Sequence, residues 1–300
     1  MASELENKLE RVKKFVKIEK IIDGDKNSPR AIRAYYRING AAYRRFHSDR
    51  GFMHFRVSKG DKIEEDDIFY QPDTVMRYMP QNARVLELGP GQGANIFYLA
   101  GKRLDATFIG VDLKPPRKPK TAPKNITFIR GNYADLNMIE SESVDLVFGI
   151  ETVVHCSDKD KVFAEVARVL KPNGVFILYD YVILNAFDAY KPYEQTVINL
   201  ISKGGASAII ESDAEWDAHF AKAGLEKISK TYLSKEGIPD LHRLALTASR
   251  ILNSDKRSKL FFKIFPRKFT NNVIIGYFAE DCVKEGLFYY NEWIYRKKQG

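Results

Sequence analysis

Two side chains that can carry charge and protons, Glu151 and His155, lie four residues apart behind an apolar run at 144–149. A carboxylate stabilises a nearby cation, and an imidazole with its ordinary pKa of about 6.5 accepts a proton near neutral pH. The pair therefore suits a reaction that passes through a cation and ends with the loss of a proton. Plainer roles stay open, since Glu151 can cap the following turn and His155 can be a hydrogen-bonded neighbour of the site.

Residues 28–56 interleave aromatic side chains with arginines. Aromatic faces attract cations, and each such contact contributes roughly 0.5–2 kcal/mol. If this segment closes over the rest of the protein, the aromatic side chains that can surround a cation are Tyr35, Tyr36, Phe52 and Phe55. Ordinary packing of the tyrosines and a core position for His54 are the alternatives.

The strongest local signal is a loop at 89–93 with glycine at every second position. It follows the apolar run 84–88, and glycine lets a backbone approach a ligand closely or adopt a positive φ. Open α/β sheets bind ligands at the carboxyl ends of their strands. The spacing is neither GxGxxG nor that of a P-loop, so a dinucleotide or nucleoside triphosphate is a poor fit. We expect a different ligand at this loop.

Polar residues follow the next two strand-like runs. Asp112 ends the run 107–112, and a carboxylate at this point can accept hydrogen bonds from a ribose diol. Asn132 follows the run 126–130, where its amide can contact an adenine amino group. Each signal is weak by itself, but together with the glycine loop they indicate a nucleoside-containing ligand.

Strand-like and helix-like runs alternate regularly from residue 84 onward. The runs predicted as strands are 84–88, 107–112, 126–130, 144–149, 175–181, 225–233 and 287–295. Helices are predicted at 94–101, 158–170 and 213–223, and another at 4–22, where apolar residues recur with a helical period. This alternation predicts an α/β protein with a mostly parallel, seven-stranded sheet and helices on both faces.

The chain is expected to divide into an N-terminal helical and aromatic cap segment, 1–72, and a main domain, 73–300. The main domain contains an insertion at about 235–285 that is longer than an ordinary connection, and we expect it to act as a lid. Within it, residues 255–269 read DKRSKLFFKIFPRKF and mix cations with bulky apolar side chains. Such a segment suits an anionic lipid surface, a lid that meets a substrate diphosphate, or a solvated helix whose apolar side packs on the domain.

Composition narrows the class of protein. Of 300 residues, 44% are hydrophobic, which allows a sizeable core and excludes a disordered, collagen-like or coiled-coil chain. The two cysteines, Cys156 and Cys282, exclude a disulfide framework, and the histidines lack metal-ligand spacing, so no metal is expected. No apolar run is long enough for a bilayer span or an N-terminal signal peptide, which favours a cytoplasmic protein. The net charge of +9 suggests an anionic partner: nucleic acid, lipid or a phosphorylated substrate.

Taken in order, the run ELGPGQG at 87–93, Asp112, the pair Gly131-Asn132 and the run VLKPNGV at 169–175 resemble the motifs of the class I S-adenosylmethionine-dependent methyltransferases. The resemblance covers about residues 80–182 and implies a Rossmann-like fold with S-adenosylmethionine as cofactor. It implies that the glycine loop contacts the methionine part, Asp112 the ribose and Asn132 the adenine. The residues so implied in cofactor binding are Glu87, Gly89, Gly91, Gly93, Asp112, Leu113, Asn132, Tyr133 and Ile150.

A finer resemblance concerns residues 148–155, FGIETVVH, which are similar to the IEATxH segment of the sterol C-methyltransferases. The Tyr-Tyr pair at 35–36, FMHF at 52–55 and the strand end at 181 agree with elements of that group. The resemblance implies catalytic roles for Glu151, His155, Tyr35 and Tyr36. The side chains it implies in substrate contact are Phe52, His54, Phe55 and Tyr181.

The function implied is methyl transfer, at carbon, to a small apolar or amphipathic molecule such as a sterol, a terpenoid or prenyl chain, or a quinone. An RNA or protein methyltransferase and an N- or O-methyltransferase of another small molecule are the alternatives. Nucleic acid is not the favoured partner, because no recognised RNA-binding module accompanies the basic run at 255–269. Peripheral contact with an anionic membrane and a homo-oligomer stay open.

Overall fold

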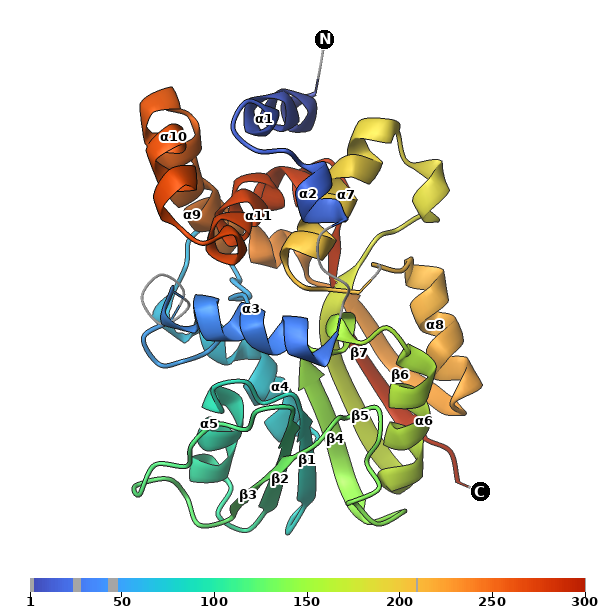
Figure 1. The fold of residues 1–300 in the computed structure, drawn as a ribbon. Coiled ribbons are helices and arrows are strands. Elements are labelled where there is room, and N and C mark those ends of the chain that lie inside the picture. The colour runs from blue at the N-terminus through green and yellow to red at the C-terminus, as the bar shows by residue number, and fades with distance from the viewer. Residues whose placement is uncertain (1–2, 24–27, 43–47, 209, 300) are drawn as a thin grey trace.

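A seven-stranded sheet forms the centre of the protein (Figure 1). The computed structural model describes residues 3–23, 28–42, 48–208 and 210–299. The strands are β1 Arg84–Leu88, β2 Thr107–Asp112, β3 Ile126–Arg130, β4 Val144–Ile150, β5 Leu170–Val182, β6 Leu225–Tyr232 and β7 Tyr289–Lys297. Their spatial order is β3-β2-β1-β4-β5-β7-β6, and β7 alone runs antiparallel to its neighbours. The predicted mostly parallel α/β sheet is confirmed.

Two strands begin at other residues than predicted, and the last residues of β4, β5, β6 and β7 differ by one or two positions. β5 begins at Leu170 rather than at 175, because Leu170 already pairs with Val144 of β4. β7 begins at Tyr289 rather than at 287, since Leu287 and Phe288 are buried in a separate core above the sheet. Both shifts come from tertiary packing that a local apolar run does not reveal.

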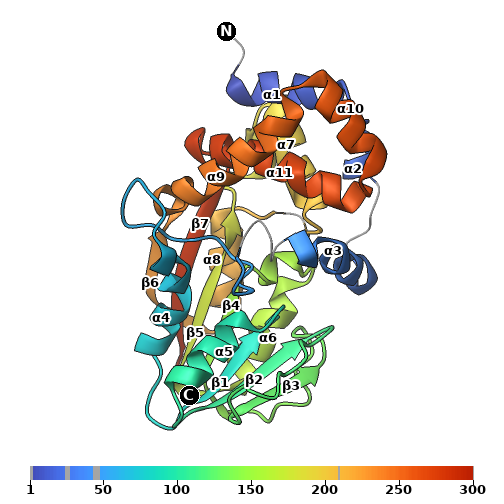
Figure 2. The same cartoon turned by 90° about the vertical axis from the view of Figure 1, so that its left-hand side faces the viewer.

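Helices cover both faces of the sheet, as predicted (Figure 2). α4 Tyr70–Arg77 and α5 Ala94–Lys102 pack on one face, where Leu99 joins Phe148 in a buried cluster. α6 Lys159–Val169 and α8 Asp213–Lys222 pack on the other, where Phe163 and Trp216 meet Trp293 of β7. Because the central strands are buried on both faces, their sequences read as continuous apolar runs.

A further group of helices, which we call the cap, lies across the carboxyl ends of the parallel strands (Figures 1 and 2). It consists of α1 Glu4–Lys13, α2 Glu19–Ile22, α3 Pro29–Ala42, α7 Pro192–Gly204, α9 Ser234–Leu252, α10 Asp255–Ile264 and α11 Arg267–Lys284. α11 is central to it, because it contacts α1, α3, α7, α9 and α10. Leu9, Ile198, Leu252 and Phe278 share a buried cluster, so the cap has a hydrophobic core of its own.

The cap draws on more of the chain than the sequence suggested. Helices α9–α11 occupy the residues expected to form an insertion, but α7 and its flanking segments, between β5 and β6, were not predicted as part of a cap. Residues 43–47, which belong to the expected aromatic segment, lie outside the described residues.

The single helix predicted at 4–22 is wrong. The chain forms α1 and α2 with a turn between them, because the Lys14 N–H bonds back to the Arg11 and Val12 carbonyls and ends the first helix. The turn redirects the chain so that Ile18 and Ile21 reach the same core as Leu9. None of the helices in the described ranges combines the length and apolar character that a bilayer crossing requires.

Candidate functional site

The glycine loop between β1 and α5 forms a tight turn at the carboxyl edge of the sheet. Gly89, Gly91 and Gly93 take positive φ angles of 63°, 55° and 84°, a region that residues with a Cβ rarely adopt. A Cβ on Gly89 would collide with the Thr152 hydroxyl, so a larger residue has no room there. The loop therefore presents backbone rather than side chains at this edge.

Asp112, at the end of β2, is held against this loop. Its Oδ2 accepts a hydrogen bond from the Gly91 N–H at 3.2 Å, and its Oδ1 accepts one from the Lys114 N–H at 2.7 Å. Burial raises the pKa of the carboxyl, whereas the two N–H donors lower it. The structure thus places Asp112 beside the glycine loop, and the two N–H donors fix the orientation of its carboxylate.

The neighbouring strand ends complete this side of the site. Asn132 is exposed after β3, and its Oδ1 accepts a hydrogen bond from the Ala134 N–H at 3.0 Å, which orients the side chain in an Asx turn. Tyr133 donates its hydroxyl proton to the Thr152 carbonyl at 2.8 Å. Leu113 is half-buried after β2, and Ile150 is buried at the end of β4.

A buried carboxylate, Glu87 of β1, lies just before the loop. It is 2% exposed, and burial raises its pKa to about 8, against a hydrogen bond from Asn95 that lowers it. Asn95 Oδ1 lies 3.0 Å from His54 Nε2, so a polar chain connects Glu87 to the aromatic segment. Among the described residues, nothing donates a hydrogen bond to Oε2 of Glu87.

Glu151 lies directly after β4 with an unusual backbone. Its φ is +50°, a conformation that is costly for a residue with a Cβ and that clusters at functional sites. Its Oε1 accepts a hydrogen bond from the Phe55 N–H at 2.8 Å. The hydroxyls of Tyr181 and Tyr290 lie close enough to the carboxylate to lower its pKa. The aromatic segment and two strands of the sheet therefore converge on this one side chain.

The surroundings of Glu151 are mainly aromatic. The Phe55 ring lies edge-on to Tyr181 and Tyr290, with centroids 5.6 Å and 6.4 Å away. Burial raises the pKa of Glu151 to about 8, opposed by the hydrogen bonds and reinforced by the charge of Asp180. An uncharged carboxyl in this setting would lower its pKa if a cation entered the site.

His155 lies in the short 3₁₀-helix η3 Val153–His155, one turn beyond Glu151. Its Nδ1 donates to the Ala206 carbonyl at 2.9 Å, which leaves Nε2 to accept the Tyr36 hydroxyl proton at 2.7 Å. Burial lowers the pKa of the imidazole, so it is neutral and basic at Nε2 near pH 7. The structure thus joins two of the predicted catalytic residues in one hydrogen-bonded pair.

Two other predicted residues make different contacts. The Tyr35 hydroxyl donates to Asn272 Oδ1 at 2.9 Å, which fixes α3 to α11, and its ring lies edge-on to that of Tyr36, with centroids 5.3 Å apart. Phe52 is 4% exposed and packs against Phe69 and Tyr98, with centroids 5.5 Å and 6.5 Å away. None of these contacts involves Glu151.

Sequence reasoning missed several residues of the site. Tyr290 contributes to the aromatic wall, Ala206 fixes the tautomer of His155, and Gln71 donates to the Phe55 carbonyl at 2.7 Å. Tyr290 carried a readable signal, because the aromatic run at 288–295 was predicted as a strand. Ala206 and Gln71 carried no such signal. Ala206 acts through its backbone carbonyl, which every residue has, and glutamine is common on protein surfaces.

Comparison with known proteins gives one family match. The family described as "Methyltransferase domain" matches residues 86–178, which include the glycine loop, Asp112, Asn132 and Glu151. A sterol 24-C-methyltransferase from Pneumocystis carinii is 32% identical over 114 residues, which are 38% of this chain. The match spans only 30% of that relative, well under half its length.

Solved structures share the fold over most of the chain. A mycolic acid cyclopropane synthase superposes with a TM-score of 0.73 at 13% identity, over 90% of this chain and 98% of that one. A geranyl diphosphate methyltransferase superposes with a TM-score of 0.65 at 14% identity, over 90% and 99% of the two chains. At such identities the likeness shows a common Rossmann-like fold.

We predict that Glu151→Gln gains stability relative to the wild type as pH rises from about 4.5 to 8. The folded-state pKa of Glu151 is raised, so the wild-type protein loses stability as the unfolded carboxyl ionises over this range, whereas glutamine does not titrate. One pKa unit corresponds to about 1.4 kcal/mol, so the difference should grow by roughly 3–5 kcal/mol over this range. Thermal melts of both proteins across this range provide the measurement.

Glu142→Gln is the control for this prediction, because that side chain is 56% exposed. Glu87 is not coupled to Glu151, so its contribution is the same in wild type and variant and cancels. A stability difference that stays flat or shrinks with rising pH would contradict the buried, neutral state of Glu151.

Proposed function

We propose that this chain, whose residues 86–178 match the family described as "Methyltransferase domain", transfers the methyl group of S-adenosylmethionine to a small apolar or amphipathic molecule. The acceptor classes that fit are sterols, terpenoid or prenyl chains and quinones, with carbon as the acceptor atom. Similarity to a sterol 24-C-methyltransferase supports this class of substrate.

The observation that carries the proposal is the wall around Glu151. A carboxylate and three aromatic rings face one another at the end of β4, beside the strand ends that bear the glycine loop and Asp112. Carboxylates and aromatic faces both stabilise cations. Transfer of a methyl cation to a carbon–carbon double bond leaves a carbocation, and an apolar substrate needs apolar walls. This arrangement suits the cation and the substrate.

The residues present fit the cofactor. The backbone cradle at Gly89 excludes a side chain, and Asp112 offers carboxylate oxygens where a ribose diol would bind. Glu87 Oε2 is a buried acceptor to which no described residue donates, and it lies next to the loop that would hold the methionine part. S-adenosylmethionine supplies an electrophilic methyl group on a sulfonium. The chain would hold it through Glu87, the glycine loop, Asp112 and Asn132.

The residues of the chain then divide the work of the reaction. Glu151, with the rings of Phe55, Tyr181 and Tyr290, would stabilise positive charge on the substrate carbon. Tyr36 would accept the proton lost from that substrate at its hydroxyl oxygen, as it passes its own proton to His155 Nε2. The imidazolium so formed keeps its Nδ1–H on the Ala206 carbonyl.

A second acceptor class fits the same wall. An amine or ammonium group would also be attracted by Glu151 and the aromatic rings, so N-methylation of a small molecule is the alternative. In that case the Tyr36–His155 pair would take the proton from nitrogen. Mass spectrometry of the product distinguishes the acceptor atoms.

We predict that the protein, incubated with a lipid extract and isotopically labelled S-adenosylmethionine, labels an apolar product. Glu151→Gln should lower kcat by about 10²-fold, or roughly 2.7 kcal/mol, with little change in cofactor affinity, because the charge matters most in the transition state. Glu292→Gln is the matched control, since its carboxylate is also buried but accepts from Tyr179 at 2.5 Å. Equal losses in the two variants would mean that burial, not charge at the site, is responsible.

We predict that Asp112→Ala weakens binding of S-adenosylmethionine by roughly 1.5–3 kcal/mol, the contribution typical of hydrogen bonds to a charged group. Isothermal titration calorimetry measures this. Asp105→Ala serves as a control, because this aspartate lies before β2 and pairs with Arg103 away from the site. Unchanged affinity in Asp112→Ala would remove Asp112 from the cofactor site.

We predict that Tyr36→Phe lowers kcat by about 10²-fold or more, since proton transfer by a positioned group contributes about that much. Tyr35→Phe tests whether the loss is specific, because the two tyrosines adjoin but only Tyr36 bonds to His155. Tyr35→Phe should cost stability through Asn272 and leave single-turnover rates within a few-fold. A Tyr36→Phe rate equal to that of Tyr35→Phe would exclude the Tyr36–His155 relay.

A further inference from the structure

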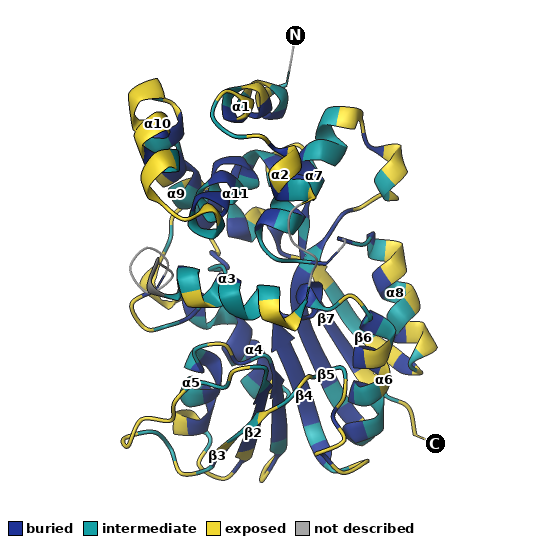
Figure 3. Ribbon diagram, viewed as in Figure 1, coloured by how far each residue is buried: buried dark blue, intermediate teal, exposed yellow. Residues whose placement is uncertain are grey.

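Helix α10 lies at the outer edge of the cap, away from the sheet (Figures 1 and 3). One of its faces is bound to the protein. Ser258 is buried and donates its hydroxyl proton to the Ile251 carbonyl at 3.1 Å, and Phe261 is 7% exposed. Phe262 stacks on Phe15 of the N-terminal segment, with centroids 6.3 Å apart. This inner face accounts for the fold of the helix.

The outer face carries large apolar side chains as well, and of these Phe265 also contacts the rings of Phe261 and Phe269. Leu260, Ile264 and Phe265 are 57%, 62% and 45% exposed. They are three of the eight exposed large hydrophobic side chains found in the described ranges, and they are gathered within six residues. Exposed apolar clusters of this kind mark an interaction surface.

Cations surround these apolar residues. The exposed basic side chains on and next to the outer face are Lys256, Arg257, Lys259, Lys263 and Arg267. The one acidic residue of the helix, Asp255, pairs with Arg11 at 2.6 Å. An apolar strip bordered by lysine and arginine is the composition that lies at the interface of an anionic bilayer.

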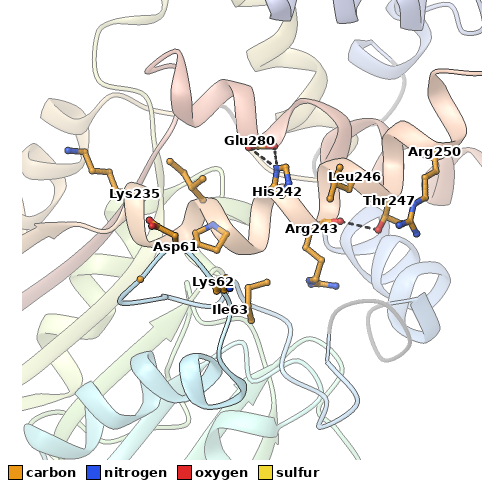
Figure 4. Close-up of a pocket in the computed structure, with 13 residues that line it drawn as sticks. Asp61, Lys62, Ile63, Lys235, His242, Arg243, Leu246, Thr247, Arg250 and Glu280 are labelled. Carbon is orange, nitrogen blue, oxygen red and sulfur yellow. Dashed lines mark hydrogen bonds and ion pairs between the residues drawn. The ribbon is translucent and has the colours of Figure 1, made fainter.

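A groove beside α9 is also lined by cations and apolar side chains (Figure 4). It has a volume of about 820 Å³ and lies between the loop at 60–63 and α9. Lys62, Lys235 and Arg250 line it, and within the described ranges none of the three forms an ion pair. Its apolar lining consists of Ile63, Ile238, Pro239 and Leu246.

The acidic residues at this groove are few and largely occupied. Glu280 binds His242 at 2.9 Å and Lys284 at 2.6 Å. Asp61 also lines the groove. Arg250 lies in the last turn of α9, and α10 packs on α9, so this end of the groove is next to α10.

We propose that this side of the cap docks on an anionic lipid bilayer, with Leu260, Ile264 and Phe265 inserted among the lipids and the surrounding cations on the headgroup phosphates. Apolar side chains on a projecting helix suit a fluid interface, whereas a nucleic acid would engage the cations but leave the apolar side chains in water. The proposal does not depend on methyl transfer, since no residue of the site takes part.

Sedimentation with vesicles tests it. The full chain should bind vesicles of phosphatidylcholine containing about a third phosphatidylserine, bind phosphatidylcholine alone at least about tenfold less, and dissociate as salt rises. K259E/K263E and, separately, L260S/I264S/F265S should each lower binding by about tenfold or more. Because Lys259 and Lys263 are exposed, K259E/K263E should keep the wild-type melting temperature. L260S/I264S/F265S loses the contacts of Phe265 with Phe261 and Phe269, so its binding is measured at a temperature at which its own melting curve shows it folded.

K120E/K124E is the matched control, since it reverses two exposed lysines in the loop between β2 and β3, away from the cap. It should bind like the wild type. K235E/R250E tests the groove and should lower binding to the anionic vesicles.

Several outcomes would overturn the proposal. They are equal binding to neutral and anionic vesicles, no binding to either, and a loss in K120E/K124E as large as in K259E/K263E. Tighter binding to single-stranded RNA, unaffected by L260S/I264S/F265S, would identify a nucleic-acid surface instead. A wild-type dimer that the same serine variant dissociates would identify a contact between copies. Methyl transfer to a detergent-solubilised substrate, assayed without vesicles, tests the proposed function separately.

Discussion

The carboxylate of Glu151 is the point on which the site depends. It accepts a hydrogen bond from the Phe55 N–H in the N-terminal aromatic segment, and the hydroxyls of Tyr181 in β5 and Tyr290 in β7 lie near enough to lower its pKa. Burying a carboxyl costs free energy unless it is hydrogen-bonded, so loss of these polar contacts would destabilise the folded protein. Segments more than 230 residues apart in the sequence are thereby held around one side chain whose backbone is itself strained.

A second set of polar contacts, from Glu87 through Asn95 to His54, also connects separate segments of the chain. It links the loop expected to hold the cofactor with the segment that forms the opposite wall. His54 and Glu87 are thus connected through Asn95 as well as through the sheet.

The sequence predicted the parts of the protein that follow from local pattern. Apolar runs and glycines located the strands and the loop, and Asp112 and Glu151 followed from their places at strand ends. It could not separate Tyr35 from Tyr36, because their difference lies in what each hydroxyl meets: Asn272 on α11 or His155 after β4. The turn that divides α1 from α2 also escaped prediction, since a helical period continued across it while packing required Ile18 to change direction.

The cap has a consequence for how the chain is made. Leu9 of α1 packs in a core with Phe278 of α11, and β7, the last strand to be synthesised, is inserted between β5 and β6. Contacts of such high sequence separation form slowly, and apolar surface stays exposed until they do. On the ribosome, α1 can therefore pack against α7 before α11 has been made, but its contact with Phe278 forms only afterwards. The apolar side chains of α1 that α11 covers stay exposed during that interval, and such surface promotes aggregation of an incomplete fold.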